Sequence, residues 1–276
     1  MKTYSLILLI TLLMILVSNT PGQDSGSRKL VANKTTYAKL TIRSAPKFTL
    51  QISGGYDYGV YELSGNNNGD FSSEEFEKGE NFGVRHGFGG SVTLKVALHQ
   101  KGNIRLNISA LYNEFSSKYS KMNVGFYGPE FVNYDVYSGV IGVENNFTPN
   151  FKFKTMVGGG FIASVISGNA RIYSENSPVD LNIIPAFRLG VTVFSGAEYA
   201  LNNWLGVNFG FRFTHANLWF KQTKESDNPN EVYLNDKRVS PRMPYSGFRQ
   251  FAWGSFNAGV NFYFGIKEKQ YIIKQY

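Results

Sequence analysis

The chain has 276 residues, of which 42% are hydrophobic, 16% aromatic and 17% charged, and its formal net charge is +8. It contains no cysteine, which excludes a disulfide scaffold, a cysteine-based zinc site and a thiol nucleophile. A mean hydropathy of −0.22 excludes a polytopic helical membrane protein. It does not exclude a membrane β-barrel, because strands that alternate apolar and polar residues average to a neutral hydropathy.

The basic balance of the chain, 28 Lys and Arg against 20 Asp and Glu, raises the question of a nucleic-acid partner. The basic residues are dispersed, with no run longer than two, and no nucleic-acid-binding motif is recognisable. We therefore expect no nucleic-acid partner.

The first 22 residues are typical of a secretory signal peptide. Met1 and Lys2 precede an apolar run from Leu6 to Val17, and a polar, turn-prone stretch follows it. The run is shorter than the roughly 20 apolar residues that a membrane-spanning helix needs. We predict a signal peptide over residues 1–22, followed by a polar periplasmic lead-in over 23–46.

The body of the chain alternates apolar and polar residues, which is typical of strands with one apolar face. In the first such segment Phe48, Leu50 and Ile52 share one face, with Thr49 and Gln51 opposite. Eight strands are predicted, over residues 48–60, 88–98, 104–109, 133–147, 151–167, 184–200, 205–213 and 248–267.

The lengths of the connections between these strands alternate. Tight turns of a few residues follow the second, fourth and sixth strands. Long polar connections follow the first, third, fifth and seventh, over residues 62–86, 116–132, 168–183 and 221–247. Short periplasmic turns and long extracellular loops are the layout of an outer-membrane barrel. The pattern predicts an all-β fold, an eight-stranded antiparallel up-and-down transmembrane β-barrel.

The final strand, GSFNAGVNFYFGI, is similar to the C-terminal signal that the barrel assembly machinery reads. Together with the signal peptide, the strand periodicity and the turn pattern, it makes residues 47–267 resemble the small eight-stranded outer-membrane β-barrel family of OmpA/OmpX type. One departure is a C-terminal tail over 268–276, because members of that family usually end on the terminal aromatic residue. The resemblance implies an outer-membrane location and insertion by the assembly machinery. It carries no activity with it.

Aromatic residues are concentrated at both ends of the predicted strands, where amphipathic rings would lie at the headgroup level of a bilayer. The set at the short-turn end is Phe147, Phe151, Tyr199, Trp204 and Phe264. The set at the long-loop end is Tyr58, Tyr61, Tyr112, Phe115, Trp219 and Phe248. We predict two aromatic girdles; the alternative is that aromatic residues are simply good strand formers.

Charged residues on the polar faces are predicted to form a network inside the barrel. The loop-end members are Asp57, Arg188, Arg212 and Arg249, and the turn-end members are Lys95, Arg105, Glu144 and Glu198. Eight strands enclose a space just wide enough for side chains, and Phe194, Phe251, Trp253 and Tyr263 share it. We therefore expect a polar plug, in which Arg212 pairs with Asp57; the alternative is a narrow ion path.

An enzymatic site has one weak indication. The segment from Phe213 to Leu218 resembles the His-x-Ser-Asn segment of outer-membrane lipid A deacylases, with His215 at the histidine position. Ala216 stands where that family has its nucleophilic serine, so the match lacks its nucleophile. We predict no catalytic residue, no metal site and no cofactor.

The leading hypothesis is a non-enzymatic outer-membrane barrel with a plugged lumen and long extracellular loops that serve recognition or envelope integrity. Its expected partners are outer-membrane lipid or lipopolysaccharide, the barrel assembly machinery during insertion, and an envelope protein. One alternative is a lipid-modifying enzyme, a lipid A or phospholipid acyl hydrolase with His215 as general base. Another is an accessory barrel of a secretion or transport complex, similar to PorT-type barrels.

Overall fold

The computed structural model describes residues 36–64, 82–99, 101–118, 129–174, 177–224, 226–237 and 249–275. The predicted signal peptide, residues 1–22, lies outside these ranges. Residues 41–270 form one compact unit, which holds the barrel, and residues 1–40 and 271–276 are assigned to a second unit. No helix within the described ranges has the length and hydropathy to cross a membrane.

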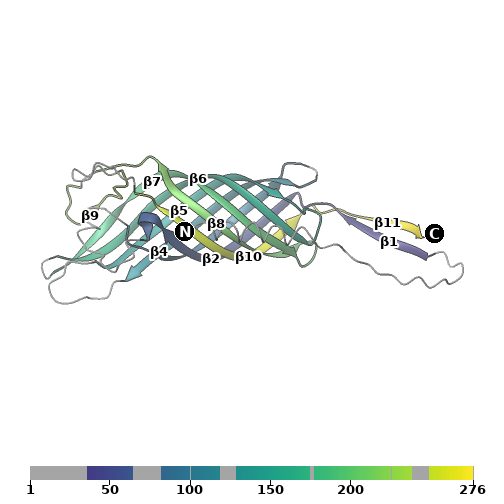
Figure 1. The fold of residues 1–276 in the computed structure, drawn as a ribbon, viewed down its shortest axis with the longest axis horizontal. Coiled ribbons are helices and arrows are strands. Elements are labelled where there is room, and N and C mark those ends of the chain that lie inside the picture. The colour runs from purple at the N-terminus through teal and green to yellow at the C-terminus, as the bar shows by residue number, and fades with distance from the viewer. Residues whose placement is uncertain are drawn as a thin grey trace, which may run out of the picture. The chain divides into compact units, whose positions relative to one another are not determined.

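Within the described residues, eight antiparallel strands form a closed sheet (Figure 1). They are β2 (Phe48–Val60), β3 (His86–Ala97), β4 (Ile104–Lys118), β5 (Pro129–Asn146), β6 (Phe153–Ser174), β7 (Ser177–Ala200), β8 (Leu205–Trp219) and β10 (Ala252–Phe264). Neighbours in the chain are neighbours in the sheet, and the pairing of β10 with β2 closes it. The predicted eight-stranded up-and-down barrel is confirmed.

Four smaller elements accompany the barrel strands. A one-turn helix, η1 (Tyr61–Leu63), follows β2, and β9 (Glu231–Val232) pairs in parallel with β7. The strands β1 (Thr36–Arg43) and β11 (Glu268–Gln275) form a separate two-stranded sheet. The predicted lead-in and C-terminal tail thus each contribute one strand that is not part of the barrel.

The alternation of side chains divides the barrel wall into an apolar outer face and a filled interior. On β8, Phe209 is 61% exposed on the outside, whereas its neighbour Asn208 is 4% exposed inside. The same parity holds on β2, where Ile52 faces outward and Ser53 inward. All eight strands carry exposed apolar side chains on the outer face, and such a surface is compatible with a hydrocarbon environment.

One predicted loop is wrong. Residues 168–183 are not a long loop, because β6 and β7 continue as a paired hairpin as far as Ser174 and Ser177. A bulge at Ile184 and Pro185 of β7 shifts the register between Ile166 and Gly168 of β6. The extra residue of a bulge changes which residues face inward, so the alternation of β7 does not continue into the hairpin. Proline within a sheet is tolerated at such positions.

One member of the predicted loop-end girdle is also placed wrongly. Phe115 is fully buried inside the barrel, because β4 continues past residue 109 and keeps the parity that points Arg105 inward. Phe248 lies outside the described residues. The other girdle residues are exposed on the outer face or at the turns and rim, at 37–70%.

The outward parity of β8 predicts the effect of a charge at its centre. Phe209→Arg should lower the free energy of unfolding in lipid vesicles by about 2–4 kcal/mol, since that is the typical cost of a basic residue near the bilayer midplane. Denaturant titration of the vesicle-inserted protein measures it, with Phe209→Leu as the apolar control. A stability equal to that of Phe209→Leu would contradict a lipid-facing position.

Candidate functional site

Four charged side chains meet inside the barrel near the short turns. Lys95 lies on β3, Arg105 on β4, Glu144 on β5 and Glu198 on β7. Nζ of Lys95 lies 2.7 Å from Oε1 of Glu198 and 3.4 Å from Oε2 of Glu144. Nη2 of Arg105 lies 2.9 Å from the same oxygen of Glu198 and also contacts Glu144. Each cation contacts both carboxylates, so the charges of this quartet cancel.

The quartet is removed from solvent, with side-chain exposures of 0–3%. Buried charges are tolerated only where opposite charges and hydrogen bonds replace the lost hydration. Nδ2 of Asn107 supplies one further hydrogen bond, to Oε2 of Glu144 at 2.9 Å. The quartet therefore links four strands across the lumen with no uncompensated charge.

Asp57 and Arg212 lie further along the lumen, where their charges attract each other without direct contact. The carboxylate of Asp57 accepts hydrogen bonds from Oγ of Ser255 at 2.5 Å and from Nδ2 of Asn113 at 2.7 Å. No hydrogen bond or ion pair joins Arg212 to Asp57 among the described residues. The guanidinium of Arg212 instead lies 5.9 Å from the centroid of the Phe194 ring.

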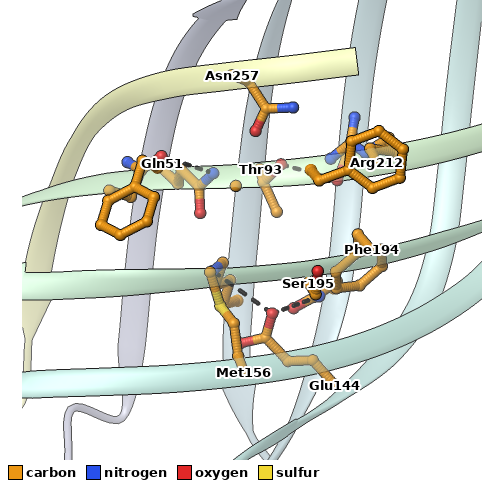
Figure 2. Close-up of a pocket in the computed structure, with 15 residues that line it drawn as sticks. Gln51, Thr93, Glu144, Met156, Phe194, Ser195, Arg212 and Asn257 are labelled. Atoms are coloured by element: carbon orange, nitrogen blue, oxygen red, sulfur yellow. Dashed lines mark hydrogen bonds and ion pairs between the residues drawn. The ribbon is translucent and has the colours of Figure 1, made fainter. Parts of the chain in front are cut away.

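A cavity of about 30 Å³ separates the quartet from Arg212. Its lining comes from strands on opposite sides of the barrel, with Gln51 and Thr93 facing Phe194 and Arg212 (Figure 2). A space of this size accommodates a water molecule or two. The ring of Phe194 narrows the cavity. This position of the ring requires glycine at residue 158, because a Cβ there would lie 2.6 Å from ring carbons of Phe194.

At the long-loop end, the segment 220–237 folds back into the barrel and brings Asp236 to Arg188. Nε and Nη2 of Arg188 donate to the two carboxylate oxygens of Asp236 at 2.7 and 2.9 Å. The same carboxylate accepts from Nδ2 of Asn217 at 2.9 Å and from the backbone N–H of Gln222 at 3.0 Å. Asp236 is fully buried, so this bidentate pair fixes the segment across the mouth.

Arg249 fixes the same segment through its backbone. Its Nη2 donates to the carbonyl oxygen of Leu234 at 2.7 Å, and its Nε donates to that of Asn235 at 3.0 Å. The guanidinium also stacks 4.3 Å from the centroid of the Phe82 ring. Nearby, burial lowers the pKa of Lys221, whose Nζ donates to the carbonyl oxygen of Arg249 at 3.0 Å.

Beside these buried contacts of Arg188 and Arg249, the mouth is filled by an apolar core. The rings of Phe251, Trp253, Phe115 and Tyr134 pack edge to face with centroids 5.4–6.0 Å apart. Leu63, Phe82, Val84 and Leu234 close over them from the connecting segments, at 0–2% exposure. The expected polar plug is thus one of two layers, and the second layer is apolar.

Two buried charged residues of the lumen were not predicted. Asp236 lies in a connection without periodicity, and the sequence contains no signal for its contact with Arg188. Lys154 is 3% exposed, and its Nζ lies 4.2 Å from the centroid of the Tyr263 ring. The parity of the predicted strand 151–167 places Lys154 opposite Phe151 and Phe153, so the alternation itself could have identified it.

His215 lies on β8, paired in register with Val191 of β7 and Ala252 of β10. Its Nε2 is buried and has no hydrogen-bond partner among the described residues. Ala216, at the position of the deacylase serine, is fully buried. Within the described ranges, no group of three or more histidine, aspartate or glutamate residues is placed to hold a metal ion.

No protein-family profile and no curated protein matches the sequence. Among solved structures, the chain is similar to Neisserial surface protein A, with 13% identity over 80% of this chain and 99% of that chain and a TM-score of 0.40. It is similar to Ail of Yersinia pestis, crystallised with the heparin analogue sucrose octasulfate, at 10% identity over 78% and 99% of the two chains and a TM-score of 0.37. It is also similar to the outer membrane protease OmpT from Escherichia coli, with 14% identity over 84% of this chain and 99% of that chain and a TM-score of 0.35. The barrel architecture itself rests on the strand pairing described above.

The quartet predicts a strong dependence of stability on each carboxylate. Glu198→Gln leaves Lys95 and Arg105 buried with one carboxylate between them, and should lower the free energy of unfolding by about 3–5 kcal/mol. Denaturant titration in detergent micelles measures the loss. Glu114→Gln, an exposed position on β4, is the control and should change little. Equal losses for the two variants would contradict a coupled buried quartet.

The Arg188–Asp236 pair predicts that the segment 220–237 opens when the pair is broken. Asp236→Asn should speed protease cleavage of this segment about tenfold or more, because a loss of about 1.4 kcal/mol already shifts an opening equilibrium tenfold. Mass spectrometry of the fragments identifies the cleaved bonds. Asp227→Asn, exposed in the same segment, should cleave at the wild-type rate, and an Asp236→Asn variant with that rate would show that other contacts hold the segment.

Proposed function

We propose that the chain is a non-enzymatic outer-membrane β-barrel whose lumen is closed and whose extracellular segments serve recognition or envelope integrity. The observation that carries the proposal is the combination of an apolar outer face with an interior filled from end to end. An apolar outer face suits a barrel surrounded by lipid. A filled interior suits a protein that transmits little through its lumen.

Three features of the interior oppose conduction. The charge quartet crosses the lumen near the turns, Phe194 narrows the middle, and the apolar core fills the mouth. An ion crossing the quartet would have to separate buried ion pairs, which costs several kcal/mol for each pair broken. The expected partners are therefore molecules that meet the outer surfaces: outer-membrane lipid or lipopolysaccharide, the assembly machinery during insertion, and an envelope protein.

Planar-bilayer recording tests the closed lumen. The purified protein should show no stable open state, because the side chains of the described residues fill the lumen between the mouth and the turns apart from the small cavity. Heat-modifiable migration on gels and retention in the outer-membrane fraction test the location on the same preparation. Steady current of high unitary conductance from protein that passes both tests would overturn the closed lumen, whereas protein that stays soluble without detergent would overturn the location.

A further inference from the structure

Four neighbouring strands rise higher than the rest of the barrel at the long-loop end. β4 pairs with β5 as far as Lys118 and Phe131, and β6 pairs with β7 as far as Ser174 and Ser177. The inner face of this raised wall is apolar and buried against the core of the mouth, through Val132, Ile172 and Leu181 among others. The described residues leave its outer face uncovered.

The outer face of the raised wall carries a row of amide and hydroxyl side chains. Ser116 is paired with Asn133, Asn133 with Asn169, and Asn169 with Asn182. Side chains of directly paired residues project from the same face of a sheet, so these four residues form a continuous row across β4 to β7. We call this row the polar ladder. Oγ of Ser116 donates to Oδ1 of Asn133 at 2.6 Å, and Asn169 and Asn182 are exposed.

A second row lies above the polar ladder and contains basic groups. Its members, in register, are Lys118, Phe131, Arg171 and Asp180. Arg171 and Asp180 form an exposed ion pair, with Nε of Arg171 2.6 Å from Oδ1 of Asp180. The Arg171 guanidinium lies 5.5 Å from the centroid of the Phe131 ring, which holds it against the wall.

Directly below the polar ladder, the outer face carries Glu114, Asp135 and Ser167, and below that row it changes to aromatic and then to apolar residues. The rings of Tyr112 and Tyr137 lie 5.0 Å apart, and the hydroxyl of Tyr112 donates to Oδ1 of Asp135 at 2.6 Å. Four residues further down β5, Ile141 is 56% exposed, and its partner Phe161 on β6 is 65% exposed. Tyrosine rings prefer the boundary between hydrocarbon and headgroups. The tyrosine pair therefore marks the level at which the hydrocarbon ends on this side of the barrel.

The height of the two polar rows above this level distinguishes between lipids. Asn133 is four residues and Phe131 six residues from Tyr137 along β5. At a rise of about 3.3 Å per residue and a strand tilt of about 40°, the β5 members of the two rows lie about 10 and 15 Å above Tyr137. The headgroup layer of one phospholipid leaflet is only about 5–8 Å deep. Both rows therefore lie above a phospholipid headgroup and level with a larger, saccharide-bearing one.

We propose that the polar ladder and the basic row above it bind the phosphorylated core saccharide of an outer-leaflet glycolipid. This inference rests on the proposed membrane location. Amide side chains offer a donor and an acceptor side by side, which suits neighbouring sugar hydroxyls, and Arg171 and Lys118 suit a phosphate. The face points sideways and continues the lipid-facing surface, so its neighbour is the lipid that already contacts the strands below.

Native mass spectrometry of the full chain in detergent, titrated with two purified lipids, tests the proposal. One lipid is lipopolysaccharide with phosphorylated core sugars. The other is the lipid A part of the same molecule, without the core sugars. The wild type should bind the core-bearing lipopolysaccharide about tenfold more tightly, because several neutral and charge-assisted hydrogen bonds to the core sugars are added. Asn169→Leu combined with Asn182→Leu should remove most of this preference and leave the affinity for lipid A unchanged.

Asn145→Leu is the matched control, since Asn145 is an exposed asparagine of the same outer face of β5 at the opposite end. It should keep the full preference for the core-bearing lipopolysaccharide. Equal binding of the two lipids by the wild type, or an undiminished preference in the double variant, overturns the inference. Heat-modifiable migration of each variant verifies its folding, and failure of the wild type to insert into vesicles would instead overturn the proposed location.

Discussion

Closure of eight antiparallel strands is the constraint on which the rest of this structure depends. It directs every second side chain of each strand into a space only wide enough for side chains. The remaining side chains of each strand face outward. The interior must then be filled and electrically balanced by residues that are far apart in the chain. Glu198 of β7, for example, meets Lys95 of β3 across the lumen.

The two ends of the lumen satisfy this constraint by different physical means. Near the turns, buried ion pairs hold the strands together. Their net effect on stability depends on how far the attraction between the charges offsets the free energy lost when each charge leaves water. Near the mouth, packed rings and aliphatic side chains exclude water, and Arg188 and Arg249 fasten the covering segment to the wall. The polar layer is built by the barrel strands alone, whereas the apolar layer also needs residues from the connections, such as Leu63 and Leu234.

Much of the barrel could be predicted because alternation is a local property. The parity of residues 48–60 and 205–213 alone indicates which side chains face outward, and the short turns at 148–150 and 201–203 indicate antiparallel neighbours. The β7 half of the hairpin over 168–183 escaped prediction because the bulge at Pro185 interrupts its alternation, whereas on β6 the alternation continues to Ile172. The contact of Asp236 with Arg188 escaped because it is a tertiary contact made by a segment without regular structure. Phe115 was misplaced because the strand that contains it is longer than its clearest alternating stretch.

The bulge at Ile184 and Pro185 also divides β7 into a hairpin part and a barrel part, which pair with β6 in different registers. From Ala186 onward, the pairing of β7 with β6 keeps the register of the barrel. Before the bulge, from Ser177 to Ile183, the two strands pair in a shifted register. Substitutions or insertions in the hairpin therefore leave the order of lipid-facing side chains below unchanged. A peptide inserted after Ser174 should for that reason leave the register of the barrel intact.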